Sequence, residues 1–410
     1  MSLPRSVAAH RDAVVELLSG PAATMATEKL PLLEALGKVL AVDLHAPLSL
    51  PPFANSQMDG FAVNSVEIPD GGAKLRVASP VPAGAAPEAL KPGFAAPIMT
   101  GAMIPEGADA VVPIERARPS TFPNPGAKDV EVELPATAPG TYVRNAGSDI
   151  KEGDLALPAG TCLGPAQLGL LAALGLTAVE VRKPWHVLLV TTGDEVLEPG
   201  RNLTPGKIYD SNGTLLEASM RQAGLDVARS RISVDDPAQL LELLRSHLGS
   251  DDGKRPIDLI VTTGGVSKGA YEVVRQAMAA QHVEFLPVAM QPGGPQGIGR
   301  FEGVPFLGFP GNPVSCLVSY EMFLRPALSL LHGAPAPRPV QRVRLVEPLR
   351  SPEGKHQVRR GTVLPDGSVR MEGGAGSHLV HALARSNALV QIPSDVTELA
   401  EGSEVEVWML

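Results

Sequence analysis

Uninterrupted apolar runs alternate with helical segments between Trp185 and Gly333, and this alternation constrains the fold more than any other feature. The runs HVLLV, LIVTT and VPFLGF are typical of strands that are buried on both faces. Helical spacing follows each of them, and Ser211 or Asn212 is expected to cap the helix predicted over 211–224. The region 181–333 is therefore predicted to be an α/β domain with a parallel sheet covered by helices.

The rest of the chain has a different texture. Residues 7–18 and 31–42 have helical spacing, and a further helix is predicted over 165–174. Short apolar runs broken by Pro and Gly predict an inserted β domain over 48–142, between the halves of a split domain at 1–47 and 143–180. Period-two alternation predicts a C-terminal β domain over 337–410, after a Pro-rich linker.

Composition limits the classes of function. A chain of 410 residues is too long for one hydrophobic core, so several domains are expected. The formal net charge is -9 and no segment is rich in Lys and Arg, which argues against nucleic acid or an anionic membrane as a partner. The chain has no long apolar run, and Cys162 and Cys316 lack metal-ligand spacing. These features predict a cytoplasmic protein that does not span a membrane.

Three strand-ending loops are candidates for chemistry, at 191–195, 262–269 and 309–315. In an open parallel sheet they should lie on one edge, where ligands bind. Gly264 and Gly265 precede a helix expected near Ala270, and Asn312 and Pro313 suit a helix start, so backbone amides there favour a phosphate group. The alternative is that these loops are merely tight turns.

Carboxylates cluster along the same predicted edge. Asp194 and Glu195 follow a buried strand, Asp210 precedes a helix, and Glu272 follows the glycine pair. Carboxylates beside a phosphate site suggest Mg²⁺, which is commonly shared between the two. Two alternatives stay open, namely that Asp210 caps the helix and that Glu272 is a solvated helix residue.

Seven ordered segments resemble one family, and the resemblance runs from about residue 5 to the C-terminus. The chain is similar to the molybdopterin molybdenumtransferases, which include bacterial enzymes, a plant cofactor-synthesis domain and the E domain of gephyrin. The resemblance rests on the segments MDGFAV, IMTGAMIPEGADAVV, TTGDEVLEPG, IYDSNG, TTGGVSKGAYE, PGNPVS, and RRG followed by GSH.

The resemblance implies an elongated homodimer with four domains per subunit: a split domain, an inserted one, a pterin-binding α/β domain and a small β domain. The implied active site lies between the last two domains and the second domain of the partner, which would bring in Asp59 and Thr100. The implied reaction places molybdate into adenylylated molybdopterin and releases AMP, with Mg²⁺. A separate molybdopterin adenylyltransferase is an implied partner.

The family's functional positions can be carried over one by one. Asp194, Glu195, Asp210 and Glu272 are the implied catalytic carboxylates, and the last three are the implied metal ligands. The implied contacts to the pterin substrate are Gly264, Gly265, Ser267, Pro310, Gly311, Asn312, Pro313 and Ser315. Arg360 and Ser377 are implied to lie near molybdate, alongside the loop at 291–295.

Four positions depart from the family pattern. Gln291 and Gly294 stand where the family often has lysines, Glu272 where it often has Asp, and Ser148 where it often has Glu. The two missing lysines remove positive charge from the implied oxyanion site. A degenerate pterin-binding or scaffold paralogue therefore remains an alternative. A nucleotide hydrolase built on the same α/β domain is another.

Overall fold

The computed structural model describes residues 3–124, 129–232, 236–248, 255–266 and 273–410. These residues form two compact units, and each is described by itself. The first contains residues 1–29, 37–41 and 180–410, and the second contains 30–36 and 42–179. The prediction of a multidomain fold with α/β and β parts is confirmed.

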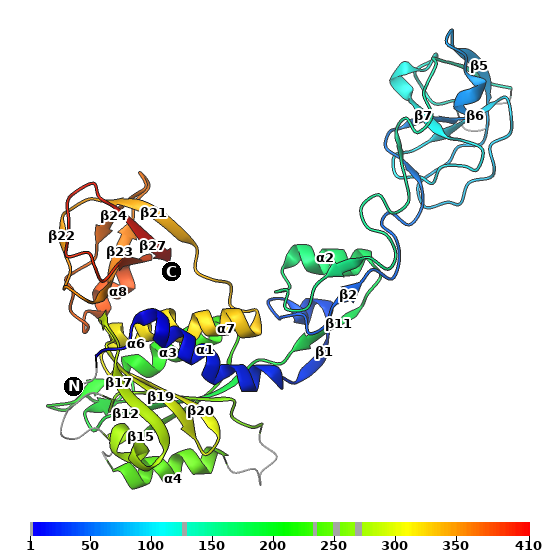
Figure 1. Ribbon diagram of the computed structural model, residues 1–410. Helices are drawn as coiled ribbons and strands as arrows, with labels where there is room; N and C mark the ends of the chain where they lie inside the picture. Colours follow the sequence, from blue (N-terminus) through cyan, green and yellow to red (C-terminus); the bar gives the residue numbers. More distant parts are fainter. Residues whose placement is uncertain (1–2, 125–128, 233–235, 249–254, 267–272) are drawn as a thin grey trace. The chain divides into compact units, whose positions relative to one another are not determined.

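A six-stranded sheet forms the centre of the first unit (Figure 1). Its strand order is β15-β12-β16-β20-β19-β17, and the first four strands are parallel, as predicted. The strands are β12 (His186–Thr192), β15 (Asp226–Ile232), β16 (Leu259–Thr263), β17 (His282–Pro287), β19 (Pro295–Phe301) and β20 (Val304–Phe309).

Strand β19 runs antiparallel to both of its neighbours, β20 and β17, which the sequence analysis did not predict. Strand β19 turns back into β20 through Glu302 and Gly303, whose φ angles are 47° and 88°. Positive φ at both central residues is the mark of the two-residue hairpin turn that matches strand twist.

Helices cover both faces of the sheet (Figure 1). Alternate residues of β12 face opposite ways: Val187 and Leu189 pack in one core cluster, and Leu188 and Val190 in the other. The covering helices are α1 (Val7–Ala23), α3 (Ser211–Gln222), α4 (Pro237–Leu248), α5 (Val273–Ala277), α6 (Pro313–Ser319) and α7 (Arg325–His332). The predicted strands are thus buried on both sides because two separate apolar layers meet them.

Helices α6 and α7 form one continuous rod through the π-helical turn Tyr320–Leu324. Within that turn the Glu321 side chain is fully buried, and its oxygens accept hydrogen bonds of 2.7 and 3.0 Å from Arg338 in the segment that leads to the C-terminal domain. The rod is also long and apolar enough to cross a membrane, but 78% of its 18-residue apolar window is buried inside the protein. It is the central core helix of this unit.

A small β-barrel ends the chain. Strands β23, β24, β21, β27 and β25 pair in that order, and β25 pairs again with β23, so the sheet closes on itself. Strand β18 (Met290–Gln291) joins its edge beside β23. The barrel elements are β21 (Val340–Leu345), β23 (His356–Val363), β24 (Ser368–Met371), β25 (Ala388–Ile392), β27 (Glu404–Met409), and, beside them, β22 (Leu349–Arg350), β26 (Glu398–Leu399) and α8 (Val380–Arg385).

The second unit contains the inserted β domain, a five-stranded sheet in the order β7-β4-β6-β5-β8. Its strands are β4 (Gly60–Val63), β5 (Ala73–Val77), β6 (Phe94–Ile98), β7 (Ala110–Pro113) and β8 (Glu131–Leu134). The short pairs β2 (Leu44–His45) with β10 (Leu155–Leu157), and β3 (Asn55–Ser56) with β9 (Val143–Arg144), lead into it, and α2 (Pro165–Ala173) follows. The strands β1 (Thr27–Pro31) and β11 (Ala178–Arg182) lie where the chain passes between the units.

Local predictions in the N-terminal part had mixed outcomes. The helices predicted over 7–18 and 165–174 are present as α1 and α2. The helix predicted over 31–42 is wrong: a 3-10 helix covers only Leu32–Ala35, and Gly37 then takes a φ of 74°. That left-handed conformation ends a helix, and it explains why apolar spacing alone misled the prediction.

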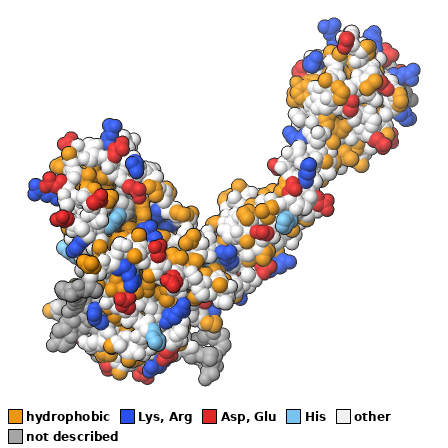
Figure 2. Space-filling model, viewed as in Figure 1, with side chains coloured by type: hydrophobic (Ala, Val, Ile, Leu, Met, Phe, Trp, Pro, Cys, Tyr) orange, Lys and Arg blue, Asp and Glu red, His pale blue; other side chains and the backbone are white. Residues whose placement is uncertain are grey.

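Figure 2 shows the side chains on one face of the molecule. Lys and Arg are scattered among acidic and apolar side chains on this face, in keeping with the mixed charge of the sequence.

The first testable prediction concerns His10, which is 1% exposed and packs edge-on against Phe323. Burial, and then the charge of Arg5, lowers the pKa of His10 from 6.5 to about 4. Between these values the unfolded chain binds more protons than the folded one, so the free energy of unfolding should fall as pH drops from 6.5 towards 4. His10→Leu should remove about 2 kcal/mol of that fall.

Urea unfolding followed by tryptophan fluorescence at pH 7 and pH 4.5 measures this effect, because Trp185 is buried in the core of the same unit. Some pH dependence should persist, since burial also lowers the pKa of His332 to about 4. The exposed His282 supplies the control variant His282→Leu. An unchanged pH slope in His10→Leu would contradict the prediction.

Candidate functional site

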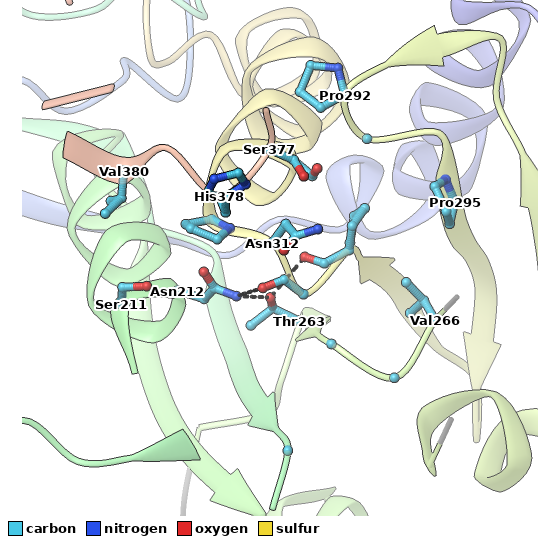
Figure 3. Close-up of a pocket in the computed structure, with 18 of the residues that line it drawn as sticks. Ser211, Asn212, Thr263, Val266, Pro292, Pro295, Asn312, Ser377, His378 and Val380 are labelled. Carbon is cyan, nitrogen blue, oxygen red and sulfur yellow. Dashed lines mark hydrogen bonds between the residues drawn. The ribbon is translucent and has the colours of Figure 1, made fainter. Parts of the chain in front are cut away.

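The carboxyl ends of β12, β16 and β20 open into a cavity of about 1120 Å³. The strand register aligns Thr191 with Thr263, and Thr263 with Phe309, so the three predicted loops lie side by side on one edge of the sheet. The barrel supplies the facing wall through Lys355 and 375–378, and the 290–295 segment supplies another. Figure 3 shows Asn212, Thr263 and Asn312 on the sheet side, with Ser377 and His378 facing them.

The backbone conformation after β16 requires glycine at two successive positions. Gly264 and Gly265 have φ angles of 93° and 64°. A Cβ atom on Gly264 would lie 2.9 Å from the carbonyl oxygen of Thr192, closer than real side chains allow. The Gly264 N–H donates to the Phe309 carbonyl at 3.1 Å, whereas among the described residues the Gly265 N–H has no acceptor. Gly265 is thus the member of the pair whose amide can meet a ligand.

The loop after β20 starts the core helix at the cavity. Asn312 is the N-cap and Pro313 holds the first helical turn, as predicted, although the Asn312 side chain makes no capping hydrogen bond. Pro310, Gly311, Asn312, Pro313 and Ser315 all line the cavity. The Val314 N–H donates to the Ser377 carbonyl at 3.0 Å, which joins this helix start to the barrel wall.

Asp210 is 3% exposed, and its carboxylate accepts hydrogen bonds from three other residues of the chain. Oδ1 accepts from the Gly213 N–H at 2.8 Å, so Asp210 is the N-cap of α3, and the predicted caps Ser211 and Asn212 are wrong. Oδ2 accepts from Thr191 Oγ1 at 2.8 Å and from Arg229 at 2.7 Å. A carboxylate has about four acceptor positions, so about one remains for another partner.

Glu195 and Asp194 follow β12 but differ in position. Glu195 is exposed and lines the cavity, and its carboxylate lies over Gly193. Asp194 is exposed outside the lining, and its backbone carbonyl accepts a hydrogen bond from Lys207 at 2.5 Å. Among the residues that the structure describes, no three His, Cys, Asp or Glu side chains gather as a ready metal site. A cation at this edge would therefore need oxygen ligands from a bound substrate as well.

Arg360 is 1% exposed and lies behind the barrel wall rather than in the cavity lining. One Nη atom donates to the Gly374 carbonyl, next to the lining segment 375–378, while Nε and the other Nη have no partner within the described part of the chain. Burial, and then the nearby Arg359, lowers the pKa of Arg360. A buried guanidinium with unused donors is suited to an oxyanion. Ser377 itself lines the cavity.

Asp59 and Thr100 lie together in the second unit. Asp59 Oδ1 accepts from the Thr100 N–H at 2.6 Å and from its hydroxyl at 2.7 Å. These two hydrogen bonds lower the pKa of Asp59, so the pair presents a fixed negative charge at the surface. Ser267 and Glu272 lie outside the described residues.

Sequence reasoning missed several lining residues, among them Asn212, Thr263, Lys355 and His378. Asn212 Nδ2 donates to Gly311 O at 2.5 Å and to Thr263 Oγ1 at 3.2 Å, so it joins α3 to two strand-end loops (Figure 3). The repeated Thr-Thr-Gly at both strand ends was a usable signal for Thr263. No local signal marks Lys355 or His378, because the fold brings them to the cavity from the barrel.

Three family models match the chain in order. They are the MoeA N-terminal region (domains I and II) at residues 5–175, a probable molybdopterin binding domain at 188–330, and the MoeA C-terminal region (domain IV) at 342–410. The second match contains the three strand-end loops, and the third contains Lys355, Arg360 and Ser377.

Full-length relatives agree with these matches. Molybdopterin molybdenumtransferase 2 of Mycobacterium tuberculosis is 43% identical over 99% of this chain and 100% of its own length. The Haemophilus influenzae molybdopterin molybdenumtransferase is 32% identical, with 93% of each chain covered. A molybdopterin biosynthesis MoeA protein from Pyrococcus horikoshii has a TM-score of 0.82 and 26% identity, with both chains covered completely. The chain therefore belongs to the molybdopterin molybdenumtransferase family.

Proposed function

We propose that this chain is a transferase that inserts molybdate into adenylylated molybdopterin, releases AMP and yields molybdenum cofactor. One observation supports this most strongly: the three loops that carry the family resemblance converge on a single large cavity. Relatives named molybdopterin molybdenumtransferase match 99% and 93% of the chain, and the three family models lie along it in order. A nucleotide hydrolase that uses only the α/β domain would leave the N-terminal and C-terminal matches unexplained.

The sheet side of the cavity is proposed to hold the pterin and its pyrophosphate. The Gly265 N–H, which has no acceptor among the described residues, and the start of α6 present donors there, and amides at a helix start favour anions. Ser315, 4% exposed at the cavity wall, contributes to its polar floor. Gly264 acts through its shape, since any side chain would strike Thr192. Ser267 is proposed to contact the same substrate.

Mg²⁺ is proposed to bind mainly through Glu195 and the pyrophosphate oxygens, because this ion often takes few protein ligands beside phosphate. The remaining acceptor position of Asp210 allows a further contact, although its carboxylate already serves Thr191, Gly213 and Arg229. Glu272 is proposed as another ligand and Asp194 as a carboxylate near the entrance. When bound, the ion would neutralise negative charge on the phosphates.

Arg360 and Ser377 are proposed to hold molybdate, which is a substrate here. Arg360 offers two nitrogen atoms that have no partner among the residues the structure describes, directly behind the segment that contains Ser377. Asp59 and Thr100 are proposed to complete the site from the second subunit of a homodimer. The reaction is proposed to take place in the cytoplasm, after a separate molybdopterin adenylyltransferase has made the substrate.

The second prediction tests the function directly. Purified protein with Mg²⁺ should release AMP from adenylylated molybdopterin only when molybdate is added, as measured by chromatography of the nucleotide. Release at the same rate without molybdate would indicate a hydrolase. Pterin binding without release, under any oxyanion, would indicate a degenerate binding protein.

The third prediction separates the roles of two carboxylates. Glu195→Gln should slow AMP release about 100-fold, which is equivalent to raising the activation free energy by about 2.7 kcal/mol. It should leave the free energy of unfolding unchanged, because Glu195 is exposed. Asp210→Asn should slow release and also lower the free energy of unfolding by about 3 kcal/mol, since it leaves Arg229 without its buried partner. Rate assays and urea unfolding on the same preparations measure both. Equal stability losses in the two variants would contradict the assignment.

The fourth prediction concerns Arg360. Arg360→Lys keeps the charge but loses the planar set of donors, so kcat/KM for molybdate should fall by about tenfold or more. Arg370→Lys, in the same barrel with its side chain 49% exposed, is the matched control and should change little. A normal molybdate dependence in Arg360→Lys would remove Arg360 from the oxyanion site.

A further inference from the structure

The cavity is short of positive charge. Among the described residues that line it, Lys355 is the only Lys or Arg, while Glu195 and Asp210 bring carboxylates. Arg229 neutralises Asp210 from outside the lining. Both proposed substrates are anions, and an exposed cation within a few ångströms of an anion stabilises it modestly even in water. The side chain that can supply this attraction from the cavity wall is that of Lys355.

The neighbouring loop at 291–294 is unable to supply it. The Gln291 side chain is neutral, and its Oε1 accepts from Gln357 Nε2 at 2.7 Å. Gly293 has a φ of 97°, and a Cβ atom there would lie 2.7 Å from the Met290 methyl group. Gly294 has no side chain. This loop therefore shapes the cavity with its backbone, and it leaves the charge to another element.

Strand pairing brings Lys355 to this loop. Strand β18 runs parallel to the start of β23, with Met290 beside His356, and the His356 N–H donates to the Ala289 carbonyl at 2.9 Å. Lys355 directly precedes this pair and lines the cavity with Gln291, Gly294 and Ser377. It is exposed and forms no ion pair with the described residues, so its ammonium group is available to a ligand.

We infer that Lys355 is a specificity-determining residue that draws the molybdate dianion into the cavity and holds it beside Ser377. This inference rests on the proposed function. Lys355 comes from the barrel wall, next to the loop at 291–294, whereas the amides suited to phosphate lie on the strand-end loops of the sheet. The oxyanion is therefore the partner of Lys355, and the pyrophosphate of the pterin substrate is not.

The test measures the two substrates separately. Lys355→Met should raise the KM for molybdate about tenfold, with kcat at saturating molybdate and the Kd for adenylylated molybdopterin changed less than about twofold. Lys355→Arg should stay within about threefold of the unchanged protein, because the charge remains. Arg350→Met is the matched control, since Arg350 is an exposed cation of the same domain whose side chain pairs with Glu398.

A rescue variant sharpens the test. Gln291→Lys in the Lys355→Met background returns a lysine to the same part of the wall, and it should restore at least half of the lost molybdate affinity on a logarithmic scale. An unchanged KM for molybdate in Lys355→Met would overturn the inference. So would a selective rise in the Kd for adenylylated molybdopterin, which would assign Lys355 to the phosphates.

A direct binding measurement keeps the inference testable without turnover. Isothermal titration of each variant with tungstate, a tetrahedral dianion of similar size, should show about tenfold weaker binding in Lys355→Met. If the unchanged protein binds tungstate but releases no AMP, the proposed function fails while the inference stands. If both proteins bind tungstate equally, the inference fails whatever the turnover.

Discussion

The carboxylate of Asp210 joins three elements beneath the cavity. It accepts hydrogen bonds from Thr191 at the end of β12, from the first turn of α3 and from Arg229 on β15. Asn212, two residues later, then connects α3 to the loops after β16 and β20. The strand ends are brought together by the parallel sheet, but these polar contacts fix the loops that leave it. The geometry of the cavity floor depends on this network. Its centre, the Asp210 carboxylate with Thr191 and the Gly213 N–H, is buried, so breaking it would leave polar groups without partners.

The sequence was informative where the signal was local or periodic. Apolar runs without alternation predicted the parallel strands, and the topology of such sheets then placed the loops after Thr192, Thr263 and Phe309 on one edge. It failed over 31–42, where Gly37 overrides helical spacing, and it missed the hairpin at Glu302–Gly303. Asp210 shows a further limit. Its cap role could be considered from sequence, but its ion pair with Arg229 depends on a strand that begins sixteen residues later.

The residues of the candidate site also fall into those that local sequence features predict and those that they do not. The glycine pair and the Asn-Pro helix start could be found from the residues themselves, since their backbone chemistry is local. Asp59, Thr100, Arg360 and Ser377 were reached through resemblance, because nothing near them in the sequence marks a ligand. Lys355 was found by neither route. It is significant only because β18 and β23 pair, and because Gln291 and Gly294 beside it carry no charge.

The long core helix contacts the barrel at one point and the segment that leads into the barrel at another. Near the start of the helix, the Val314 N–H donates a hydrogen bond to the Ser377 carbonyl. About two turns further on, the buried Glu321 carboxylate forms an ion pair with Arg338, in the segment that leads into the barrel. Because these two contacts hold the barrel to one long helix, the barrel has little freedom to move away from the α/β domain. We therefore expect substrates to enter and leave without separation of the barrel from the α/β domain, past the side chains at the rim of the cavity. Turnover in such a protein should be limited by small local movements rather than by a large hinge.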